Sequence, residues 1–306
     1  MKTLITGGAG FIASNIADRL IAEGHQVGIV DNLLTGKEKN IPREAIFYKE
    51  DIRNYILKHI FEVSKPEVVL HYAAQIDVRK SVENPAYDLD INGMGMVNVL
   101  EQCRKNNVKK VIYASSGGCV YGNTNKFPTP ETEERRPESP YGITKMLGEQ
   151  YLDFYNKVHG LNYTILRYGN IYGPRQDSKG EAGVIDIFAN QMLDDKPIII
   201  YGDGEQIRDY TFVGDVVNAN VAALTKGDNQ VFNIASERPI SVKNLYHIIN
   251  NAMGQKSDAV YMPARKGELM RSELDCTKAH DILGWKAKVS LEDGIRQTIQ
   301  WIKENK

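Results

Sequence analysis

The stretch TLITGGAGFIA at residues 3–13 decides the fold of this chain, because a short β-branched run enters a glycine loop and then a helical pattern. A loop of this kind between a strand and a helix lets the backbone approach a pyrophosphate, which the helix N-terminus stabilises. A glycine pattern alone is weak evidence, since many such matches are plain tight turns. Here the loop follows the first strand, so we expect Gly7, Gly10, Phe11 and Ile12 to bind a dinucleotide cofactor.

Asp31 stands at the end of the second predicted strand, 21 residues after Gly10. A carboxylate at this place accepts hydrogen bonds from the adenosine ribose and repels a 2′-phosphate. Asn32 follows it and no arginine stands beside it, so the sequence predicts NAD rather than NADP, with both residues at the cofactor. An ordinary turn residue is the alternative interpretation of Asp31. Ala13 occupies the place where a third glycine often stands, which is a departure from the usual pattern.

Strands and helices alternate through the first half of the chain. Apolar runs predict strands at 3–6, 26–30, 45–49, 67–73 and 110–115, and helical patterns lie between them at 11–24, 54–63 and 85–106. Such alternation is typical of βαβ units. The sequence therefore predicts an α/β fold with a Rossmann-like doubly wound parallel sheet.

A further helix is predicted over 141–159, preceded by Ser139 and Pro140 as N-cap and first residue. Its apolar residues recur at helical spacing, so we expect one buried stripe formed by Leu147, Tyr151, Phe154 and Val158. A strand is expected at 162–167. The rest of the chain is less regular. We expect a Rossmann domain over 1–168, to which 205–238 returns, and a smaller C-terminal α/β substrate domain made of 169–204 and 239–306.

Composition excludes several classes of function. The 306 residues carry a net charge of −1, which gives no basic surface for nucleic acid or an anionic membrane. Cys103, Cys119 and Cys276 have no metal-binding or disulfide spacing, so no metal site is expected and a reducing cytoplasm fits. No apolar run approaches the roughly 18 residues of a membrane span, and the N-terminus does not resemble a signal peptide. We expect a cytoplasmic protein without nucleic-acid or membrane partners.

Two further strand ends fit the same cofactor crevice. Asp51 and Ile52 follow the third strand, where an aspartate can reach the adenine amino group. The fourth strand ends in Tyr72, Ala73 and Ala74, and the two alanines are small enough for a cofactor to lie against the backbone. Ordinary strand-end chemistry is the alternative for both groups.

Tyr141 and Lys145 are separated by four residues on the helix over 141–159, so they share a face. A tyrosine is normally a poor base because its unperturbed pKa is near ~10. A nearby ammonium favours the phenolate and moves the pKa of the phenol toward the working range. A surface neighbour pair is the alternative, but this pair follows the fifth strand of a dinucleotide fold. We therefore expect it to be catalytic.

Three motifs in this order, TGGAGFIA (6–13), SSGGCVYG (115–122) and YGITK (141–145), resemble the extended short-chain dehydrogenase/reductase family. Within it, the chain is most similar to the NAD-dependent sugar-nucleotide epimerases, and there to UDP-glucose (UDP-galactose) 4-epimerases of archaeal and thermophile type. The similarity covers essentially the whole chain, including later stretches at 167–176, 201–216 and 282–286. It implies a UDP-sugar substrate and a homodimer whose helices near 85–106 and 141–159 pair as a four-helix bundle.

The resemblance also implies a reaction. The sugar 4′-hydroxyl loses its proton to the tyrosine while C4 gives a hydride to tightly held NAD, and the keto sugar then turns and regains the hydride on its other face. Tyr141 would be the acid/base, and Lys145 would hold the nicotinamide ribose. Tyr168 and Ser115 would also lie at the cofactor.

The family's catalytic hydroxyl falls on Gly117 in this chain, three residues before Val120. Either Ser116 takes the role through a kink at Gly117 and Gly118, or a water molecule replaces the hydroxyl. A third interpretation is that Ser115 and Ser116 only end the strand against the cofactor. We expect Ser116 to be a catalytic helper and Gly117 to enlarge the sugar site.

The family's substrate residues map onto seven positions here. The diphosphate would meet two arginines, whose bidentate contacts suit phosphates, although an isolated arginine is more often a surface ion pair. A small residue at the position that gates the sugar pocket admits N-acetyl sugars, and this position is Ser272. The remaining positions would touch the phosphate, the sugar or the uridine. The expected substrate residues are Gly117, Asn170, Val184, Tyr201, Arg208, Arg265 and Ser272.

Other reactions on this fold are alternatives. A 4,6-dehydratase needs an Asp-Glu pair where this chain has Gly118 and Cys119, so dehydration is disfavoured. A 4-reductase is disfavoured because Asp31 selects against NADPH. A UDP-glucuronate 4-epimerase or decarboxylase stays open, as does an NAD-binding regulator without turnover, although retention of Tyr141 and Lys145 argues against the last.

Overall fold

A seven-stranded parallel sheet forms the centre of the computed structural model, which describes residues 1–177, 183–254, 257–265 and 269–306. The strand order is β10-β6-β5-β4-β1-β2-β3, and every neighbouring pair runs parallel. The strands are β1 (Lys2–Thr6), β2 (Gln26–Asp31), β3 (Ile46–Lys49), β4 (Val68–His71), β5 (Lys110–Ser116), β6 (Asn162–Tyr168) and β10 (Gln230–Ile234). The predicted doubly wound α/β fold is confirmed.

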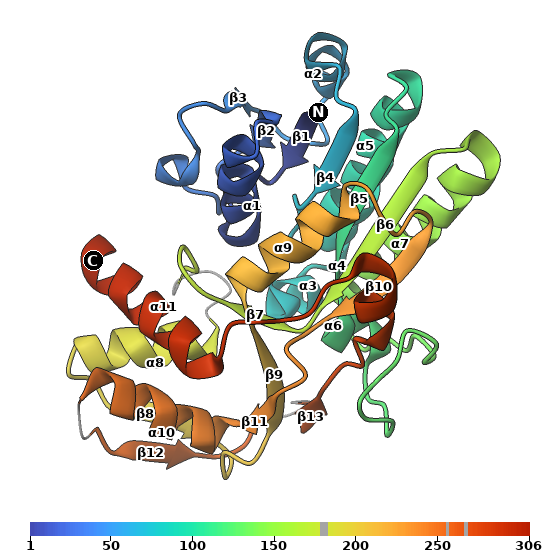
Figure 1. The fold of residues 1–306 in the computed structure, drawn as a ribbon. Coiled ribbons are helices and arrows are strands. Elements are labelled where there is room, and N and C mark those ends of the chain that lie inside the picture. The colour runs from blue at the N-terminus through green and yellow to red at the C-terminus, as the bar shows by residue number, and fades with distance from the viewer. Residues whose placement is uncertain (178–182, 255–256, 266–268) are drawn as a thin grey trace.

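Helices cover both faces of this sheet (Figure 1). On one face α1 (Phe11–Ala22) and α9 (Val213–Ala223) pack in a core that includes Ile16, Leu20 and Val216. On the other face lie α2 (Leu57–Ser64), α5 (Gly95–Lys105) and α7 (Pro140–His159). Because both faces are buried, the central strands are continuously apolar rather than alternating.

The chain reverses its direction of winding at β1, which lies between β2 and β4. In an open parallel sheet, ligands bind outside the carboxyl ends of the strands at such a switch point. The short elements at this edge are η1 (Glu38–Asn40), α3 (Val78–Glu83), α4 (Pro85–Leu89), the π-helix η2 (Asp90–Met94) and α6 (Gly117–Tyr121). The helix expected over 85–106 is confirmed: α4, η2 and α5 follow one another without a break from Pro85 to Lys105, with η2 as a π-helical turn inside it.

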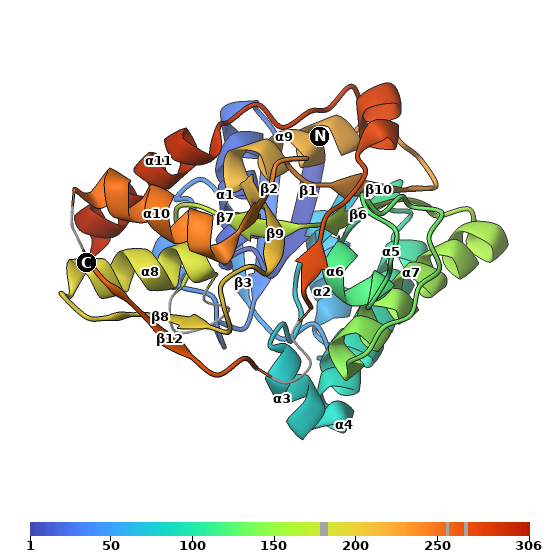
Figure 2. The same ribbon diagram turned by 90° about the horizontal axis from the view of Figure 1, so that it is seen from below.

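A smaller group of elements lies beside the sheet, and α8, α10 and α11 gather there in both views (Figures 1 and 2). Their buried residues form a core of their own. The elements are β7 (Asn170–Tyr172), β8 (Ile198–Tyr201), β9 (Ile207–Phe212), β11 (Pro239–Ser241), β12 (Ala259–Met262), β13 (Arg271–Ser272), α8 (Val184–Leu193), α10 (Val242–Met253) and α11 (Leu291–Asn305). The π-helix η3 (Ala279–Leu283) instead packs against α9 and β10, in the core of the main sheet. Strands β7, β11 and β13 all pair with β9, and β12 pairs with β8.

The buried stripe expected on α7 is wrong. Phe154 and Val158 are 48% and 58% exposed, while Leu147 and Tyr151 are half-buried. The face that packs on the sheet instead carries Tyr141, Lys145, Glu149 and Leu152. Polar side chains on the buried face hid its periodicity, and an apolar stripe on the outer face was mistaken for it. Among the described residues, no helix is both long and apolar enough to cross a membrane.

Candidate active site

The glycine loop passes directly against the end of β4. Gly7 has φ +71°, and a Cβ built on it would lie 2.6 Å from the backbone nitrogen of Ala73. Only glycine fits this passage. The Gly10 amide donates to the Gly7 carbonyl at 3.0 Å, and Gly10 is the N-cap of α1. In the part of the chain that the structure describes, no side chain caps α1, so the first-turn amides at Phe11 and Ile12 can donate to a phosphate.

Asp31 ties the glycine loop to the end of β2. Its Oδ2 accepts a hydrogen bond from the Ala9 amide at 3.0 Å, and its Oδ1 accepts one from the Leu33 amide at 2.8 Å. Burial raises the pKa of Asp31, and these two backbone hydrogen bonds oppose the rise. The Asn40 side chain donates to the Ala9 carbonyl at 3.1 Å and so holds the loop from its other side. The Asp31 carboxylate therefore fixes the glycine loop at the end of β2, where the cofactor was predicted to bind.

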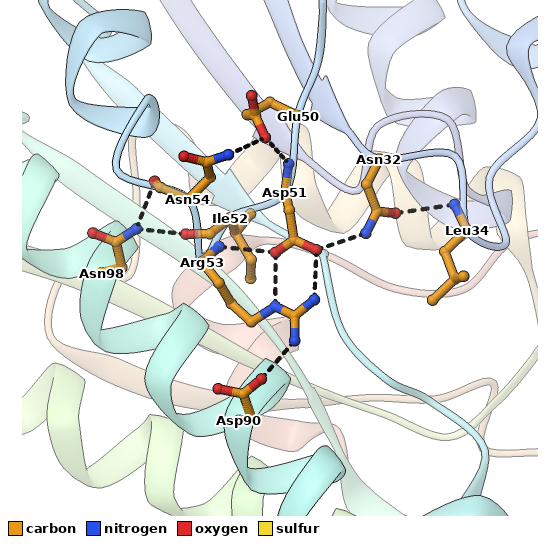
Figure 3. A network of polar contacts seen from close by, with 9 residues as sticks. All are labelled: Asn32, Leu34, Glu50, Asp51, Ile52, Arg53, Asn54, Asp90 and Asn98. Atoms are coloured by element: carbon orange, nitrogen blue, oxygen red, sulfur yellow. Dashed lines mark hydrogen bonds and ion pairs between the residues drawn. The ribbon is translucent and has the colours of Figure 1, made fainter.

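The adenine end of the predicted crevice contains a charged network (Figure 3). The Arg53 guanidinium donates through Nε to Asp51 Oδ1 at 2.9 Å and through NH2 to Asp51 Oδ2 at 2.8 Å, and its NH1 reaches Asp90 at 2.5 Å. Asn32 also donates to Asp51, at 2.9 Å. The hydrogen bonds from Arg53 lower the pKa of Asp51 to about 2. The Ile52 carbonyl accepts from Asn98 at 2.6 Å, so the three predicted residues lie in one network.

Tyr72 and Tyr168 meet each other on the α9 face of the sheet. Their hydroxyls are hydrogen-bonded to one another, and the Tyr72 hydroxyl also donates to Asn220 Oδ1 at 2.8 Å. The Asn220 amide donates in turn to the Tyr168 hydroxyl at 2.9 Å. Burial raises the pKa of both phenols. The hydroxyls of both tyrosines are thus hydrogen-bonded to groups of the protein itself. Ala73 and Ala74 follow β4, and Ala73 lies against the glycine loop.

Tyr141 and Lys145 lie one turn apart on α7, at the end of β5. The Lys145 ammonium donates to the Ala114 carbonyl at 2.9 Å and lies 5.7 Å from the centre of the Tyr141 ring. The Ser139 hydroxyl caps α7 by accepting from the Gly142 amide at 3.2 Å. Both members of the pair are at least nine-tenths buried. An ammonium this near a phenol stabilises the phenolate form.

His71 faces this pair from β4. Its Nδ1 is 2.7 Å from the Thr6 hydroxyl, and its ring stacks on Tyr113 with centroids 5.8 Å apart. Burial and the charge of Lys145 lower the pKa of His71 to about 3. The imidazole is therefore neutral over the physiological range and adds no positive charge beside Lys145.

The strand carrying the two serines ends sharply at Ser116. Ser116 is the N-cap of α6, and its hydroxyl accepts from the Cys119 amide at 3.4 Å. A Cβ built on Gly117 would lie 2.6 Å from the Leu274 side chain, so Leu274 would have to shift to admit a larger residue there. The chain thus turns immediately after Ser116. The Ser115 hydroxyl points the other way and donates to Glu149 at 2.7 Å.

A cavity of about 340 Å³ lies beside β7 to β9 and α8. The Arg265 guanidinium is stacked over the Tyr201 ring at 3.8 Å from its centre. Two predicted substrate residues lie elsewhere: Gly117 is at the β5 turn, and the Ser272 hydroxyl is 3.4 Å from the place of a Cβ on neighbouring Gly118. The other five predicted substrate residues all line the cavity: Asn170, Val184, Tyr201, Arg208 and Arg265.

Residues 3–235 match the model of the NAD-dependent epimerase/dehydratase family. The chain belongs to this family. A UDP-glucose 4-epimerase from Mycolicibacterium smegmatis is 41% identical over 309 residues, 99% of each chain. The solved structure of UDP-glucose 4-epimerase with UDP-glucose from Thermotoga maritima has 48% identity, a TM-score of 0.98 and coverage of 100% of this chain and 99% of its own. The Thermus thermophilus UDP-glucose 4-epimerase in complex with NAD has 39% identity, a TM-score of 0.94 and 99% coverage of both chains.

Sequence reasoning missed several polar residues that surround this family site. Arg53, which binds Asp51, could have been found from the Asp-Ile-Arg order after β3. Glu149, which accepts from Ser115, lies one turn beyond Lys145 on the same helix face, so its spacing carried a signal. Asn92 had no such signal, because the π-helix that aims it at Gln75 is a local irregularity.

Proposed function

We propose that this chain is an NAD-dependent UDP-glucose 4-epimerase that interconverts UDP-glucose and UDP-galactose. The observation that carries the proposal is the buried Tyr141–Lys145 pair at the carboxyl edge of the sheet, in a chain whose cavity beside β7 to β9 and α8 is lined by Arg208 and Arg265. The full-length likeness to epimerases that bind UDP-glucose and NAD supports it.

The crevice fits NAD. A side chain at Gly7 would fill the passage between the glycine loop and β4, and the N-terminus of α1 offers amides to a pyrophosphate. Asp31 at the end of β2 is suited to the adenosine ribose and unsuited to a 2′-phosphate. When bound, NAD accepts a hydride from C4 of the sugar and returns it to the opposite face.

Each step of the protein's own chemistry has a candidate group. Tyr141 removes the proton of the 4′-hydroxyl and later returns it, and the Lys145 ammonium stabilises the phenolate between the two transfers. Ser116, at the turn after β5, is our candidate for a second hydrogen bond to the 4′-oxygen. Arg208 and Arg265 neutralise the diphosphate and so fix the sugar at the catalytic end.

The substrate range depends on the sugar end of the site. Ser272 lies beside Gly118, and neither residue fills space as an aromatic side chain would. We therefore propose that UDP-GlcNAc and UDP-GalNAc are also interconverted. Ser272→Tyr should abolish turnover of the acetylated sugars while keeping that of UDP-galactose. If wild-type enzyme turns over only the unacetylated pair at saturation, this part of the proposal fails.

We also propose a division of labour and an assembly. Residues 1–168, joined by much of 205–238, would form the NAD-binding domain, and 169–204 with 239–306 the nucleotide-sugar-binding domain.

The exposed apolar outer face of α4, η2 and α7 would form a four-helix bundle with a second copy of the chain in the cytoplasm. Phe154→Glu should yield monomers in size-exclusion chromatography with light scattering. The apolar residues of this face are Leu89, Met94, Ile143, Phe154 and Val158.

The test is to incubate purified protein with UDP-galactose, without added NAD, and to follow UDP-glucose by chromatography. We expect conversion by wild type and a loss of about 100-fold or more in Tyr141→Phe, which is within the usual contribution of a general acid/base. Tyr155→Phe is the matched control, because the Tyr155 hydroxyl lies on the same helix but donates to Glu101. Equal rates for Tyr141→Phe and wild type would refute the proposed role of Tyr141.

A further inference from the structure

A buried ion pair lies directly behind the catalytic pair. Arg167 on β6 donates through Nε to Glu149 Oε1 at 2.8 Å and through NH2 to Oε2 at 2.6 Å. Each of the two residues is 3% exposed. Buried ion pairs are poor sources of stability, since packed apolar residues of similar volume are often as stable or more so. The pair therefore needs an explanation other than stability of the fold.

The same two side chains hold both ends of one short segment. The Ser115 hydroxyl, at the start of the segment, donates to Glu149 at 2.7 Å. The Tyr121 hydroxyl, at its end, accepts from Arg167 NH1 at 2.8 Å, and the guanidinium lies 4.9 Å from the centre of the Tyr121 ring. The ion pair thus brackets residues 116–120 from both sides.

Within the bracketed segment Val120 is fully buried and Ser116 pairs with Tyr168 in the β5–β6 ladder, but the two residues directly after Ser116 are glycines. These are Gly117 and Gly118, which have no side chains to pack, and glycine has the largest backbone freedom of any residue. Ser116 precedes these glycines and stands at the turn from strand to helix. Anchors at both ends of the segment therefore restrict the backbone on either side of Ser116 and the two glycines.

The anchor is built on the catalytic helix itself. Tyr141, Lys145 and Glu149 follow one another at intervals of four residues on the buried face of α7. A bond to Glu149 is therefore a bond to the element that carries the acid/base. Ser115 is also the residue opposite Arg167 in the β5–β6 ladder. Both members of the ion pair therefore contact β5 at Ser115, Glu149 through its side chain and Arg167 as the neighbour on β6.

We propose that Glu149 and Arg167 are positioning residues that lock the Ser116–Gly118 turn to the Tyr141–Lys145 helix, with Ser115 and Tyr121 as their points of attachment. This inference rests on the proposed epimerase function and deepens it. It assigns to the Ser115 hydroxyl an internal role in place of the predicted contact with the cofactor.

The test uses Ser115→Ala and Tyr121→Phe, each of which removes one attachment to the ion pair and leaves the pair itself complete; Tyr121→Phe also removes the hydrogen bond that the Tyr121 hydroxyl donates to Asn233 Oδ1 at 2.8 Å. We expect kcat for UDP-galactose to fall about tenfold in each variant, since small misplacements of reacting groups have effects of this size or larger. KM and the content of bound NAD should stay unchanged. The double variant should lose less than the product of the two single losses, because one unit is released in both cases. Ser115→Thr, which restores the hydroxyl, should regain most of the lost kcat.

Hydrogen–deuterium exchange provides a readout that does not depend on activity. Peptides covering 116–120 should exchange about tenfold faster in both variants, and at the wild-type rate in Tyr155→Phe, the control. Unchanged exchange, or faster exchange with unchanged kcat, would overturn the inference. A rise in KM together with a loss of bound NAD and of thermal stability would also overturn the inference, because it would mark a structural role only. If wild type itself fails to epimerise, the proposed function is refuted, and the exchange data still decide whether the turn is anchored.

Discussion

Protonation of His71 should make the protein unusually sensitive to acid. The imidazole is 2% exposed, and burial together with Lys145 lowers its pKa from 6.5 to about 3. In the unfolded chain His71 binds a proton near pH 6.5, whereas in the folded chain it stays neutral until the pH is far lower. The stability contributed by the neutral imidazole is therefore complete above pH 6.5 and is lost progressively as the pH falls toward 3.

The size of the effect follows from linkage. Each pH unit below 6.5 costs about 1.4 kcal/mol while the folded protein excludes the proton. At pH 5.0 the cost is about 2 kcal/mol, a large share of the free energy of unfolding of an ordinary domain. His71→Asn keeps an acceptor for the Thr6 hydroxyl but cannot bind the proton, so this part of the pH dependence should disappear.

The assay is urea denaturation of both proteins at pH 7.0, 6.0 and 5.0, at one fixed protein concentration because the proposed dimer would couple stability to concentration. Between pH 7.0 and 5.0, wild type should lose about 2 kcal/mol more than His71→Asn. Parallel curves for the two proteins would refute the reasoning, because they would mean that His71 titrates normally in the fold.

Three substitutions test other parts of the site. Arg53→Ala removes the two hydrogen bonds that the guanidinium donates to the Asp51 carboxylate. NAD should then dissociate about tenfold faster, which is the loss expected for one charge-assisted contact, and the cofactor retained on a desalting column measures it. Gly7→Ala forces a side chain into a φ of +71° and against the backbone of Ala73, and the urea midpoint and NAD content should both fall. Arg265→Ala removes a cation from the cavity wall, and the KM for UDP-galactose should rise about tenfold with a smaller change in kcat; a wild-type KM would place the diphosphate elsewhere.

Much of the fold could be predicted because its signals are local. The glycine loop after β1, Asp31 at the end of β2 and the apolar runs of the central strands each follow from rules that act over a few residues. Ser139 was recognised as an N-cap for the same reason, and its hydroxyl does cap α7. The π-helical turn inside the predicted helix at 85–106 was missed, because a π-helix leaves the hydrophobic pattern almost unchanged.

The polar interior could not be predicted in the same way. The spacing of Glu149 after Lys145 placed it on the catalytic face of α7, but its pairing with Arg167 appears only once β6 lies beside α7. Such residues also misled the periodicity argument on α7, because a buried face containing Lys145 does not resemble a core. Direct reasoning from motifs located the ends of strands, but it could not say which side chains turn inward there.

The central claim is that hydride leaves C4 and returns to the same sugar without exchange with water. The most direct measurement is turnover of UDP-galactose carrying deuterium at C4, in ordinary water and without added NAD, followed by mass spectrometry of the UDP-glucose formed. The account predicts that the product keeps its deuterium at C4. Product that has lost the deuterium to solvent, or the absence of UDP-glucose, would contradict it.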